Sequence, residues 1–599
     1  MTQEHHKGHP FLIENFDGLN ESENEFADPS NPGGMHPNQA RRLEELRPDG
    51  GSLVKVRGNQ QHSVFSWKGA DRPCTLIRWA KEDGTAYWVM TAWDNVFVYE
   101  SGAWVPLLKP SKYGGYHPSQ LLEYLNRRFD WCVYKDSLYL TDGSNRMLRF
   151  DGNNIGPAGL QKFTGVTVIA GYGCTGTGDL PAEDFKYQTT LYDDVNELEG
   201  NISDAILTVI TMVPTDLWIN LSHTSTPPWI ATGNYDYHNS LARYVRLYRT
   251  APAGWGVEGN RYLVGQFRAG LLATGFIDEL DDLGATGRLT DADGRFNTND
   301  PLNPDETATG DKAINVTLPS TPVCYIDHDG TFTPYQVTGL TDTTLILEDS
   351  SGGTFGAGAN HGGMGDIPKC PYYVFGGIKD SVYDLSDNEL YFGDEPDEED
   401  VTDHSPPPLG AAICMYGDRN NRCHLAGDPA HPNRVYYSAL GFPDYWPQGN
   451  WNDLDSDDSD AVNAIIKFQG KLLYFKRKSI TIGHVDGDPA TWVWIPKALS
   501  VGASHRRIIA DCGGLLIFAN SAGVYAYDGQ SLNLLSDRRE GSNIKQTWER
   551  VVKEELSRGE AVYHEDRKEF WLSVCLRDHR GAYDSARVGG GEIEEEATS

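Results

Sequence analysis

The sequence has few basic residues, no long apolar run and no cysteines spaced as Cys-x-x-Cys. Its 51 Lys and Arg stand against 85 Asp and Glu, so the formal net charge of the 599-residue chain is −34. Surfaces that bind nucleic-acid phosphates are basic, which argues against a protein whose main surface does this. Apolar runs stay short of the ~18 residues of a membrane span, and the first residues do not read as a signal peptide.

The cysteines are odd in number and scattered. Nine are spread from Cys74 to Cys575, which favours reduced thiols over a disulfide framework or a zinc site. We therefore expect a protein that is made and assembled in a reducing cytoplasm.

Catalytic patterns such as G-x-S-x-G, H-E-x-x-H and the phosphate-binding loop are missing from the sequence. Gly171–Gly176 matches the dinucleotide pattern G-x-G-x-x-G, but Pro181 and a strand follow where a helix would have to face the pyrophosphate. We expect no enzyme and no cofactor.

Two acidic segments, Asp291–Asp300 and Asp453–Asp460, set oxygen side chains at alternate positions, as calcium prefers, yet neither fits the EF-hand pattern. Solvated acidic loops are the default interpretation, and calcium binding stays open. His5, His6 and His9 lack the Cys or carboxylate frame of a metal site. We predict no bound metal.

The chain is rich in glycine, proline and tyrosine, with 64, 32 and 30 of them, as turn-rich β proteins are. One pattern recurs: a strand, a turn, a second strand and Asp-Gly, at 133–152, 468–487 and 512–529. Such a hairpin cannot bury its apolar face alone and needs a neighbour on each side. Blades of β-propellers recur every ~40–50 residues, and Gly470, Gly513 and Asp566 follow a comparable spacing.

We therefore predict an all-β fold: a β-propeller with an inserted immunoglobulin- or fibronectin-like β-sandwich and a further small β insert. An array of sandwiches is the alternative. Short helices are expected at 117–127 and 544–555. The predicted divisions are an extended arm (1–45), the first blades (46–163), the sandwich (164–284), the second insert or decorated loops (285–375), the remaining blades (376–588) and an acidic flexible tail (589–599).

Several short blocks follow one another in an order that resembles a known family. They are Gly33-Gly34, Pro37–Ala40, Gly51–Gly58, Phe185–Ala205, Arg246–Thr250, Asn433–Pro443, Asp457–Ile465, Phe475–Ile480, Val501-Gly502 and Leu516–Phe518. In this order they resemble the tail nozzle proteins of short-tailed bacteriophages and the related packaged-DNA stabilisation proteins. The resemblance covers most of residues 30–575, with a gap near 285–370.

The resemblance implies a structural virion protein, assembled in the host cytoplasm and located in the tail. Subunits of this family form a ring, often a hexamer, that extends the DNA channel below the portal and adaptor proteins. It also implies contacts with tail fibre, spike or needle proteins and transient contact with genomic DNA.

An acidic wall suits a channel through which DNA must slide, because like charge weakens phosphate binding. The acidic residues that we expect to face the channel or a space between subunits are Asp397, Glu398, Glu399, Asp400, Asp453, Asp455, Asp457, Asp458 and Asp460. The candidates for phosphate contacts are Lys476, Arg477 and Lys478, and the other interpretation of this cluster is a turn that balances nearby acids. Arg506-Arg507 is a second basic cluster of the same kind.

Other functions stay open at this point. A propeller enzyme that degrades surface glycans would need two carboxylates across a pocket. A host-receptor-binding tail protein would differ by its position in the virion. A cellular propeller scaffold is the third alternative.

Overall fold

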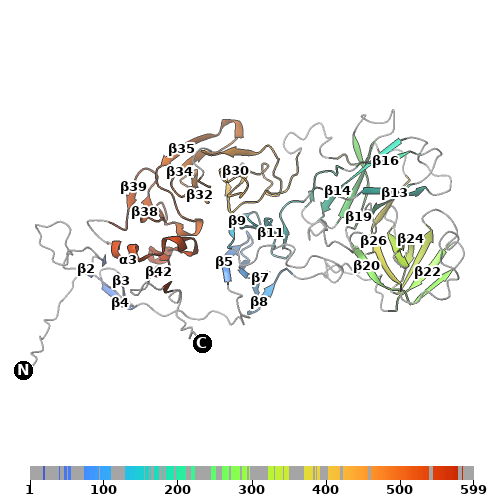
Figure 1. Ribbon diagram of the computed structural model, residues 1–599, viewed down its shortest axis with the longest axis horizontal. Helices are drawn as coiled ribbons and strands as arrows, with labels where there is room; N and C mark the ends of the chain where they lie inside the picture. Colours follow the sequence, from blue (N-terminus) through green and yellow to red (C-terminus); the bar gives the residue numbers. More distant parts are fainter. Residues whose placement is uncertain are drawn as a thin grey trace, which may run out of the picture.

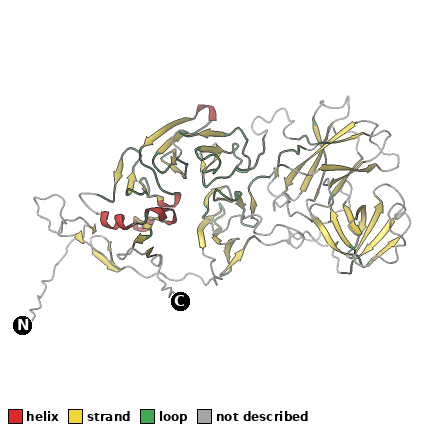
Figure 2. Ribbon diagram, in the orientation of Figure 1, coloured by secondary structure: helices red, strands yellow, loops and turns green. Residues whose placement is uncertain are grey.

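The computed structural model describes the chain between residues 73 and 577 with gaps, the longest at 109–127, 223–243, 297–313, 350–369 and 392–402. Outside that range it describes five short strands, β1 (Gly18–Leu19), β2 (Gln39–Ala40), β3 (Leu46–Asp49), β4 (Ser52–Lys55) and β43 (Tyr583–Asp584). Strands dominate the described chain, and helical turns gather near its C-terminal part (Figure 2). The predicted all-β class, built on antiparallel sheets, is confirmed.

Five sheets have the same plan: four antiparallel strands that pair in the order in which they occur in the chain. The first is β5 (Pro73–Ala80), β6 (Ala86–Ala92), β7 (Asn95–Glu100) and β8 (Ala103–Pro106), and the second is β9 (Asp130–Tyr134), β10 (Ser137–Thr141), β11 (Leu148–Phe150) and β12 (Ile155–Pro157). The third is β28 (Ala412–Tyr416), β29 (Arg422–Ala426), β30 (Arg434–Tyr437) and β31 (Trp451–Asp453). The fourth is β32 (Ala464–Phe468), β33 (Lys471–Phe475), β34 (Ile480–His484) and β35 (Val493–Leu499). The fifth is β36 (Ile509–Asp511), β37 (Leu516–Ala519), β38 (Val524–Tyr527) and β39 (Leu532–Leu534).

A sixth sheet has two strands, β40 (Glu560–His564) and β41 (Glu569–Ser573). Before it lie helix α3 (Lys545–Arg550) and a 3-10 turn, η5 (Lys553–Arg558), in the region where a helix was predicted. The strand pair β42 (Leu576–Arg577) and β43 follows it. The other predicted helix, at 117–127, lies outside the described residues. None of the described helices is long and apolar enough to cross a bilayer.

Two-residue turns set the register of these hairpins. Gln469 and Gly470 join β32 to β33, and both have positive φ, at 48° and 71°. Ser101 and Gly102 join β7 to β8 with φ of 49° and 88°. A turn with two positive φ values matches the right-handed twist of the strands that it joins, and glycine adopts this conformation at little cost.

Successive sheets pack face to face because their strands alternate between two apolar faces. On β33, Leu472 and Tyr474 pack toward the third sheet, whereas Leu473 and Phe475 pack toward the fifth. On β10, Leu138 and Leu140 pack toward the first sheet, and Tyr139 packs toward the third. With both faces buried, each strand reads as a short apolar run. Figure 1 shows the six sheets around a common centre on one side of the molecule.

A lobe of two sheet assemblies is inserted between β12 and β28 (Figure 1). The first assembly has two sheets that face each other. One contains β13 (Thr167–Gly173), β17 (Leu217–Ser222) and β27 (Gly377–Asp380). The other contains β15 (Leu198–Glu199), β14 (Asp184–Asp193), β18 (Tyr244–Thr250) and β19 (Arg261–Arg268), and β16 (Leu207–Ile210) also pairs with β14. The second is a seven-stranded sheet of β20 (Leu271–Phe276), β26 (Pro371–Phe375), β23 (Val323–His328), β24 (Thr331–Leu340), β25 (Thr344–Asp349), β22 (Thr286–Thr290) and β21 (Glu279–Asp282).

The boundary expected between residues 284 and 285 is not where the structure divides the lobe. β20 to β22, at 271–290, belong to the seven-stranded sheet, and β27 returns to pair with β17 in the first assembly. Of the two alternatives for 285–375, the described strands fit the second small β insert, which begins earlier, at β20, and not decorated loops. Such pairings join strands far apart in sequence, and local patterns carry no signal for them.

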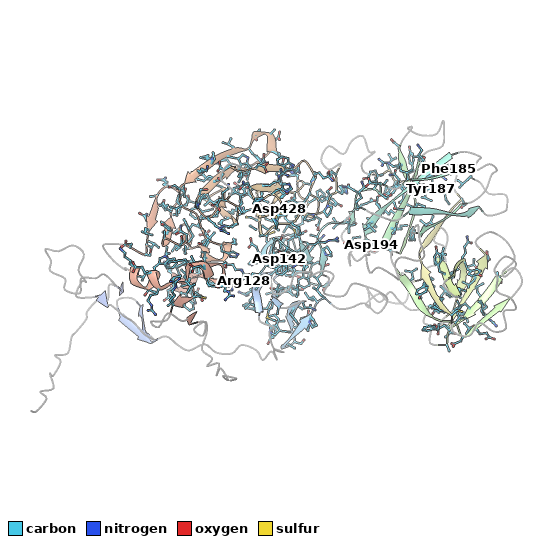
Figure 3. All side chains as sticks on the ribbon, in the orientation of Figure 1. Arg128, Asp142, Phe185, Tyr187, Asp194 and Asp428 are labelled. Atoms are coloured by element: carbon cyan, nitrogen blue, oxygen red, sulfur yellow. The ribbon has the colours of Figure 1, made fainter. Side chains whose placement is uncertain are left out.

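Buried polar contacts fasten the first assembly together and to the six sheets. Arg249 and Asp380, both fully buried, form an ion pair of 2.7 Å between its two sheets, and Figure 3 labels Phe185 and Tyr187 in the same core. Tyr445, from the loop after β30, packs into this core and its hydroxyl accepts a hydrogen bond of 3.1 Å from the Glu199 amide.

The residue beside it anchors the same loop to the second sheet. The Asp444 carboxylate accepts hydrogen bonds from Tyr139 (2.8 Å), Arg149 (3.1 Å) and the Gly159 amide (3.1 Å). One loop thus holds both the second sheet and the lobe.

His424 predicts how acid destabilises this core. It is 1% exposed between the third and fourth sheets, with Nδ1 3.1 Å from the Tyr474 hydroxyl. Burial, with a smaller effect of Arg422, lowers its pKa to about 3. In the unfolded chain His424 binds a proton near pH 6.5, whereas in the folded chain it does so only near pH 3. The free energy of unfolding therefore falls as the pH drops from about 6.5 to about 3, by up to ~1.4 kcal/mol per pH unit.

In urea unfolding measured across this pH range, His424→Gln is expected to remove this part of the slope. A slope equal to that of the wild type would contradict the prediction.

Candidate functional site

The first strands of four successive sheets converge on a central cavity. β9, β28, β32 and β36 line a space of about 350 Å³ with side chains that include Trp131, Cys132, Ile413, Cys414 and Ile465. Lys467, Arg506 and Asp511 add charge to this lining. The cavity thus brings together strands of the second, third, fourth and fifth sheets.

An ion pair supports the wall of the cavity. Asp130, at the start of β9, lies 3.5 Å from the Arg506 guanidinium and accepts a hydrogen bond of 3.0 Å from the Ile413 amide. Burial raises the pKa of Asp130, and Arg506 and the Ile413 amide act against that rise. The pair fixes β9, β28 and the turn before β36 relative to one another.

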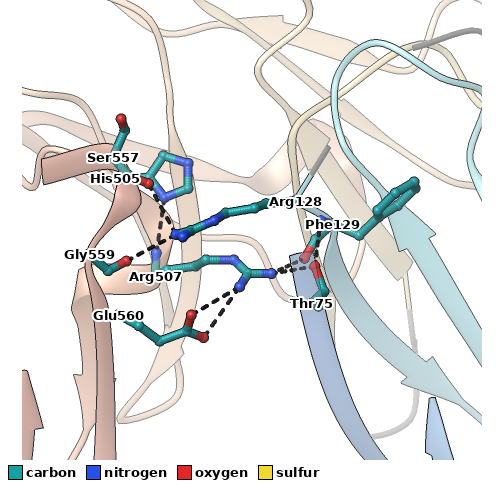
Figure 4. A network of polar contacts seen from close by, with 8 residues as sticks. All are labelled: Thr75, Arg128, Phe129, His505, Arg507, Ser557, Gly559 and Glu560. Atoms are coloured by element: carbon teal, nitrogen blue, oxygen red, sulfur yellow. Dashed lines mark hydrogen bonds and ion pairs between the residues drawn. The ribbon is translucent and has the colours of Figure 1, made fainter. Parts of the chain in front are cut away.

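Two arginines close the circuit between the last sheets and the first (Figure 4). From the turn before β36, Arg507 donates to Thr75 on β5 (2.6 Å) and to the Phe129 carbonyl (2.9 Å), while its other terminal nitrogen binds the Glu560 carboxylate of β40 (3.2 Å). From the opposite side, Arg128 donates to the carbonyls of Ser557 (3.3 Å) and Gly559 (3.4 Å).

The electrostatics of this network suit a structural role. Burial lowers the pKa of Arg507, Glu560 opposes this effect and Arg128 adds to it. Burial and the neighbouring arginines lower the pKa of His505 to about 4, and its Nδ1 accepts a hydrogen bond of 3.3 Å from the Arg507 amide. The two terminal nitrogens of the planar guanidinium reach in different directions, one to Thr75 and the Phe129 carbonyl and the other to Glu560, whereas a lysine carries all its donors on one atom.

The sequence singled out Arg506-Arg507 only as a basic cluster. The partners of these arginines come from the far end of the chain: Arg507 and Thr75 are 432 residues apart. In the sequence, only the neighbouring pair Arg506-Arg507 could have pointed to this network of hydrogen bonds.

The predicted phosphate contacts separate into one buried and two exposed residues. Lys476 is 1% exposed, and its ammonium donates to Asn433 (3.2 Å) and to the carbonyls of Leu454 (2.9 Å) and Asp455 (3.1 Å). Burial leaves Lys476 unable to reach a phosphate in solution, so the expectation for this residue is corrected. Arg477 and Lys478 are exposed, and for them a phosphate contact stays a prediction.

The described acidic candidates lie beside this basic turn. The Asp453 carboxylate pairs with Arg434 at 3.0 Å, and Asp460 accepts a hydrogen bond of 3.0 Å from the Lys478 amide. Asp455, with a positive φ of 46°, supplies one of the carbonyls that hold Lys476. Hydrogen bonds through the Lys478 amide and the Leu454 and Asp455 carbonyls thus join the acidic loop and the basic turn between the third and fourth sheets. Asp397, Glu398, Glu399, Asp400, Asp457 and Asp458 lie outside the described residues.

The remaining motifs have structural surroundings. Gly171–Gly173 lie on β13, which pairs antiparallel with β17. Asp291 is buried, and its carboxylate accepts a hydrogen bond of 2.7 Å from Tyr372 in the seven-stranded sheet.

Within the described part of the chain, no group of three or more His, Cys, Asp or Glu side chains is placed to hold a metal. The seven cysteines that the structure describes are free thiols. His5, His6 and His9 lie outside it.

No protein-family model and no curated protein matches the sequence. Solved structures that align with this chain include the extracellular domain of the putative one-component system BT4673 from B. thetaiotaomicron (10% identity, 87% of this chain and 72% of that one, TM-score 0.19). The designed protein Ika8 aligns at 7% identity over 75% of this chain and 93% of its own, with a TM-score of 0.15. PorZ, a surface component of the type-IX secretion system of Porphyromonas gingivalis, aligns at 11% identity over 74% and 65%, with a TM-score of 0.14. TM-scores this low carry no argument about fold or function.

Arg507→Lys is expected to loosen the closing network, because a single ammonium replaces the two terminal nitrogens that reach Glu560 on one side and Thr75 and Phe129 on the other. We expect a loss of about 2 kcal/mol in urea unfolding, from charge-assisted hydrogen bonds. Arg558→Lys is the matched control: Arg558 is 69% exposed in a surface pair, so the change should be within ~0.5 kcal/mol. Equal effects of the two substitutions would contradict a closing role.

The basic turn predicts two separable effects. Lys476→Met leaves the Leu454 and Asp455 carbonyls without their donor and should cost about 1–3 kcal/mol of unfolding free energy. The double variant Arg477→Gln/Lys478→Gln should keep the stability of the wild type but weaken binding to duplex DNA, measured by fluorescence anisotropy at two salt concentrations. Unchanged DNA binding in the double variant would remove the predicted phosphate contact.

Proposed function

We propose that the six sheets are the blades of a β-propeller and that the first assembly of the lobe is its inserted immunoglobulin- or fibronectin-like sandwich. Three observations support this. Strands follow one another within each blade, each apolar strand has a buried face toward both neighbours, and Arg507 with Arg128 joins the last blade to the first. Radial closure of this kind leaves only short sheet edges open to other chains.

We further propose that the protein is a structural component of a short-tailed bacteriophage tail, in the nozzle or hub ring that extends the DNA channel. The observation that carries this proposal is where the family-like blocks lie. Phe185–Ala205 and Arg246–Thr250 form the lobe core, and Asn433–Pro443 runs from β30 into the loop that attaches the lobe. Three of the ten blocks thus lie in the lobe or in the loop that attaches it, and four more lie along the fourth and fifth sheets.

A rigid junction is what a ring subunit needs. The backbone of Glu199 in the lobe is held from the other side of the junction at both its groups: its amide donates to the Tyr445 hydroxyl (3.1 Å), and its carbonyl lies 2.8 Å from Nδ1 of His404, whose ring stacks on Tyr445. Such a junction holds the lobe at one angle to the propeller. With that angle held, identical subunits can repeat their contacts around a closed ring.

The charge of the chain fits a conduit for DNA. With a net charge of −34, a ring lined by these subunits would repel the phosphates of a passing genome and keep its affinity low. The acidic residues at 397–400 and 453–460 are the proposed channel-facing loops. Portal-adaptor proteins above and fibre, spike or needle proteins below complete the proposed assembly.

Mass photometry and negative-stain electron microscopy of the purified full chain test this function. We expect closed rings of about six 66.4-kDa subunits. Tyr445→Ala, which removes the ring packed in the lobe core, should reduce the share of closed rings, while Tyr445→Phe should keep it. A monomer at micromolar concentration, or one that cleaves host polysaccharide, would contradict the proposal and favour a glycan-degrading enzyme.

A further inference from the structure

Polar groups from three residues line the central cavity and have no hydrogen-bond partner among the described residues. They are the indole N–H of Trp131 on β9, the terminal nitrogens of Arg506 in the turn before β36, and one carboxylate oxygen of Asp511 on β36. The other Asp511 oxygen accepts a hydrogen bond of 3.0 Å from the Gly513 amide. Donors and an acceptor are thus available to a ligand in one space.

Arg506 differs in this respect from the neighbouring Arg507. Arg507 uses both of its terminal nitrogens inside the protein, in the network with Thr75 and Glu560. Arg506 has the ion pair of 3.5 Å between its Nε and Asp130, and this Nε is buried without a hydrogen bond in the described structure. Its side chain is 31% exposed and lines the cavity, so its terminal donors are accessible from there.

An apolar surface lies beside these polar groups. Trp131 is 40% exposed although it comes from the first strand of its sheet, and the buried residues Ile413 and Ile465 line the same cavity. An exposed indole in a cavity presents a flat apolar face together with one polar N–H group. Ligand pockets combine apolar walls with a few polar groups in the same way.

The charges around the cavity select the class of ligand. Lys467 and Arg506 supply two positive charges, and Asp511 together with Asp130, the partner of Arg506, supplies two negative ones. An anion or a cation therefore meets a like charge as well as an opposite one. The Trp131 and Arg506 nitrogens only donate and the Asp511 oxygen only accepts, whereas a hydroxyl group can do both. The site thus favours a neutral ligand with several hydroxyl groups.

We propose that the central cavity binds a neutral sugar of one or two rings. The apolar face of one pyranose ring stacks on Trp131, while its hydroxyls accept from Arg506 and donate to Asp511. The volume of about 350 Å³ lies at the lower end of the roughly 300–1,000 Å³ of ligand pockets. Among the described residues that line the cavity, Asp511 is the one carboxylate, and glycoside hydrolysis uses two, so the sugar is bound and not cleaved.

This inference rests on the cavity and not on a role in a phage tail, so either can fail alone. Saturation-transfer NMR on the full chain tests it, with the methyl glycosides of glucose, galactose, mannose and N-acetylglucosamine as probes. We expect saturation transfer to the ring protons of at least one of them. Mass photometry of the same sample reports ring formation separately.

Variants locate the binding. Trp131→Ala, which removes the stacking face, should weaken binding at least ~10-fold in a titration. Asp511→Asn keeps an oxygen for the Gly513 amide but replaces the free acceptor with a donor, and should also weaken binding by about 10-fold. Asp511 is exposed, so this variant keeps the test decisive if Trp131→Ala does not fold. Trp571→Ala is the matched control: Trp571 is 50% exposed on β41, outside the cavity lining, and its loss should leave binding unchanged.

Four results would overturn the proposal. Without transfer to any of the four glycosides, the cavity is not a sugar site. Binding that a folded Trp131→Ala or Asp511→Asn variant leaves unchanged lies elsewhere on the molecule. Tighter binding of glucuronate than of methyl glucoside means that charge selects the ligand. Release of methanol from a bound glycoside means that the sugar is cleaved.

Discussion

The architecture depends on one constraint: inner strands such as β10 and β33 carry apolar residues on both faces, and burying both faces requires a neighbouring sheet on each side. Leu472 and Leu473, adjacent on β33, pack toward different neighbouring sheets. A sheet of this kind needs a partner on each side, its partner needs another, and the series ends only when it returns to its start. The circuit of sheets around the central cavity follows from that requirement.

Polar contacts join the parts of the molecule at the two places where the packing of one sheet on the next is interrupted. One interruption is the lobe, which enters between the second and third sheets, and there Asp444 and Tyr445 hold the loop, the second sheet and the lobe core together. The other is the return to the first sheet, where Arg507 binds Thr75 on β5, Glu560 on β40 and the carbonyl of Phe129 just before β9. Buried hydrogen-bonded groups contribute modest net stability but allow few alternative arrangements, so these residues set angles more than they add free energy.

The net charge of the chain and the contacts of its individual charged residues lead to different conclusions about binding. The excess of acids suits a surface that must not bind DNA tightly. Within the fold, however, acids and bases lie together: Lys476 is enclosed by the carbonyls of the acidic loop, and Asp453 pairs with Arg434. A basic cluster in an acidic chain can thus be part of the packing, and burial decides whether a given lysine can reach a ligand.

The sequence alone determined the strands, their pairing within each hairpin and the scarcity of helix. Those features come from two-residue periodicity and from turns such as Gln469-Gly470, both local properties. Only the tertiary structure decided that β27 returns to β17, that β20–β22 join the seven-stranded sheet, and that Arg507 reaches Thr75. The physical reason is that these contacts join residues from 54 to 432 positions apart, whose meeting depends on how whole sheets pack and leaves no periodic trace in either segment.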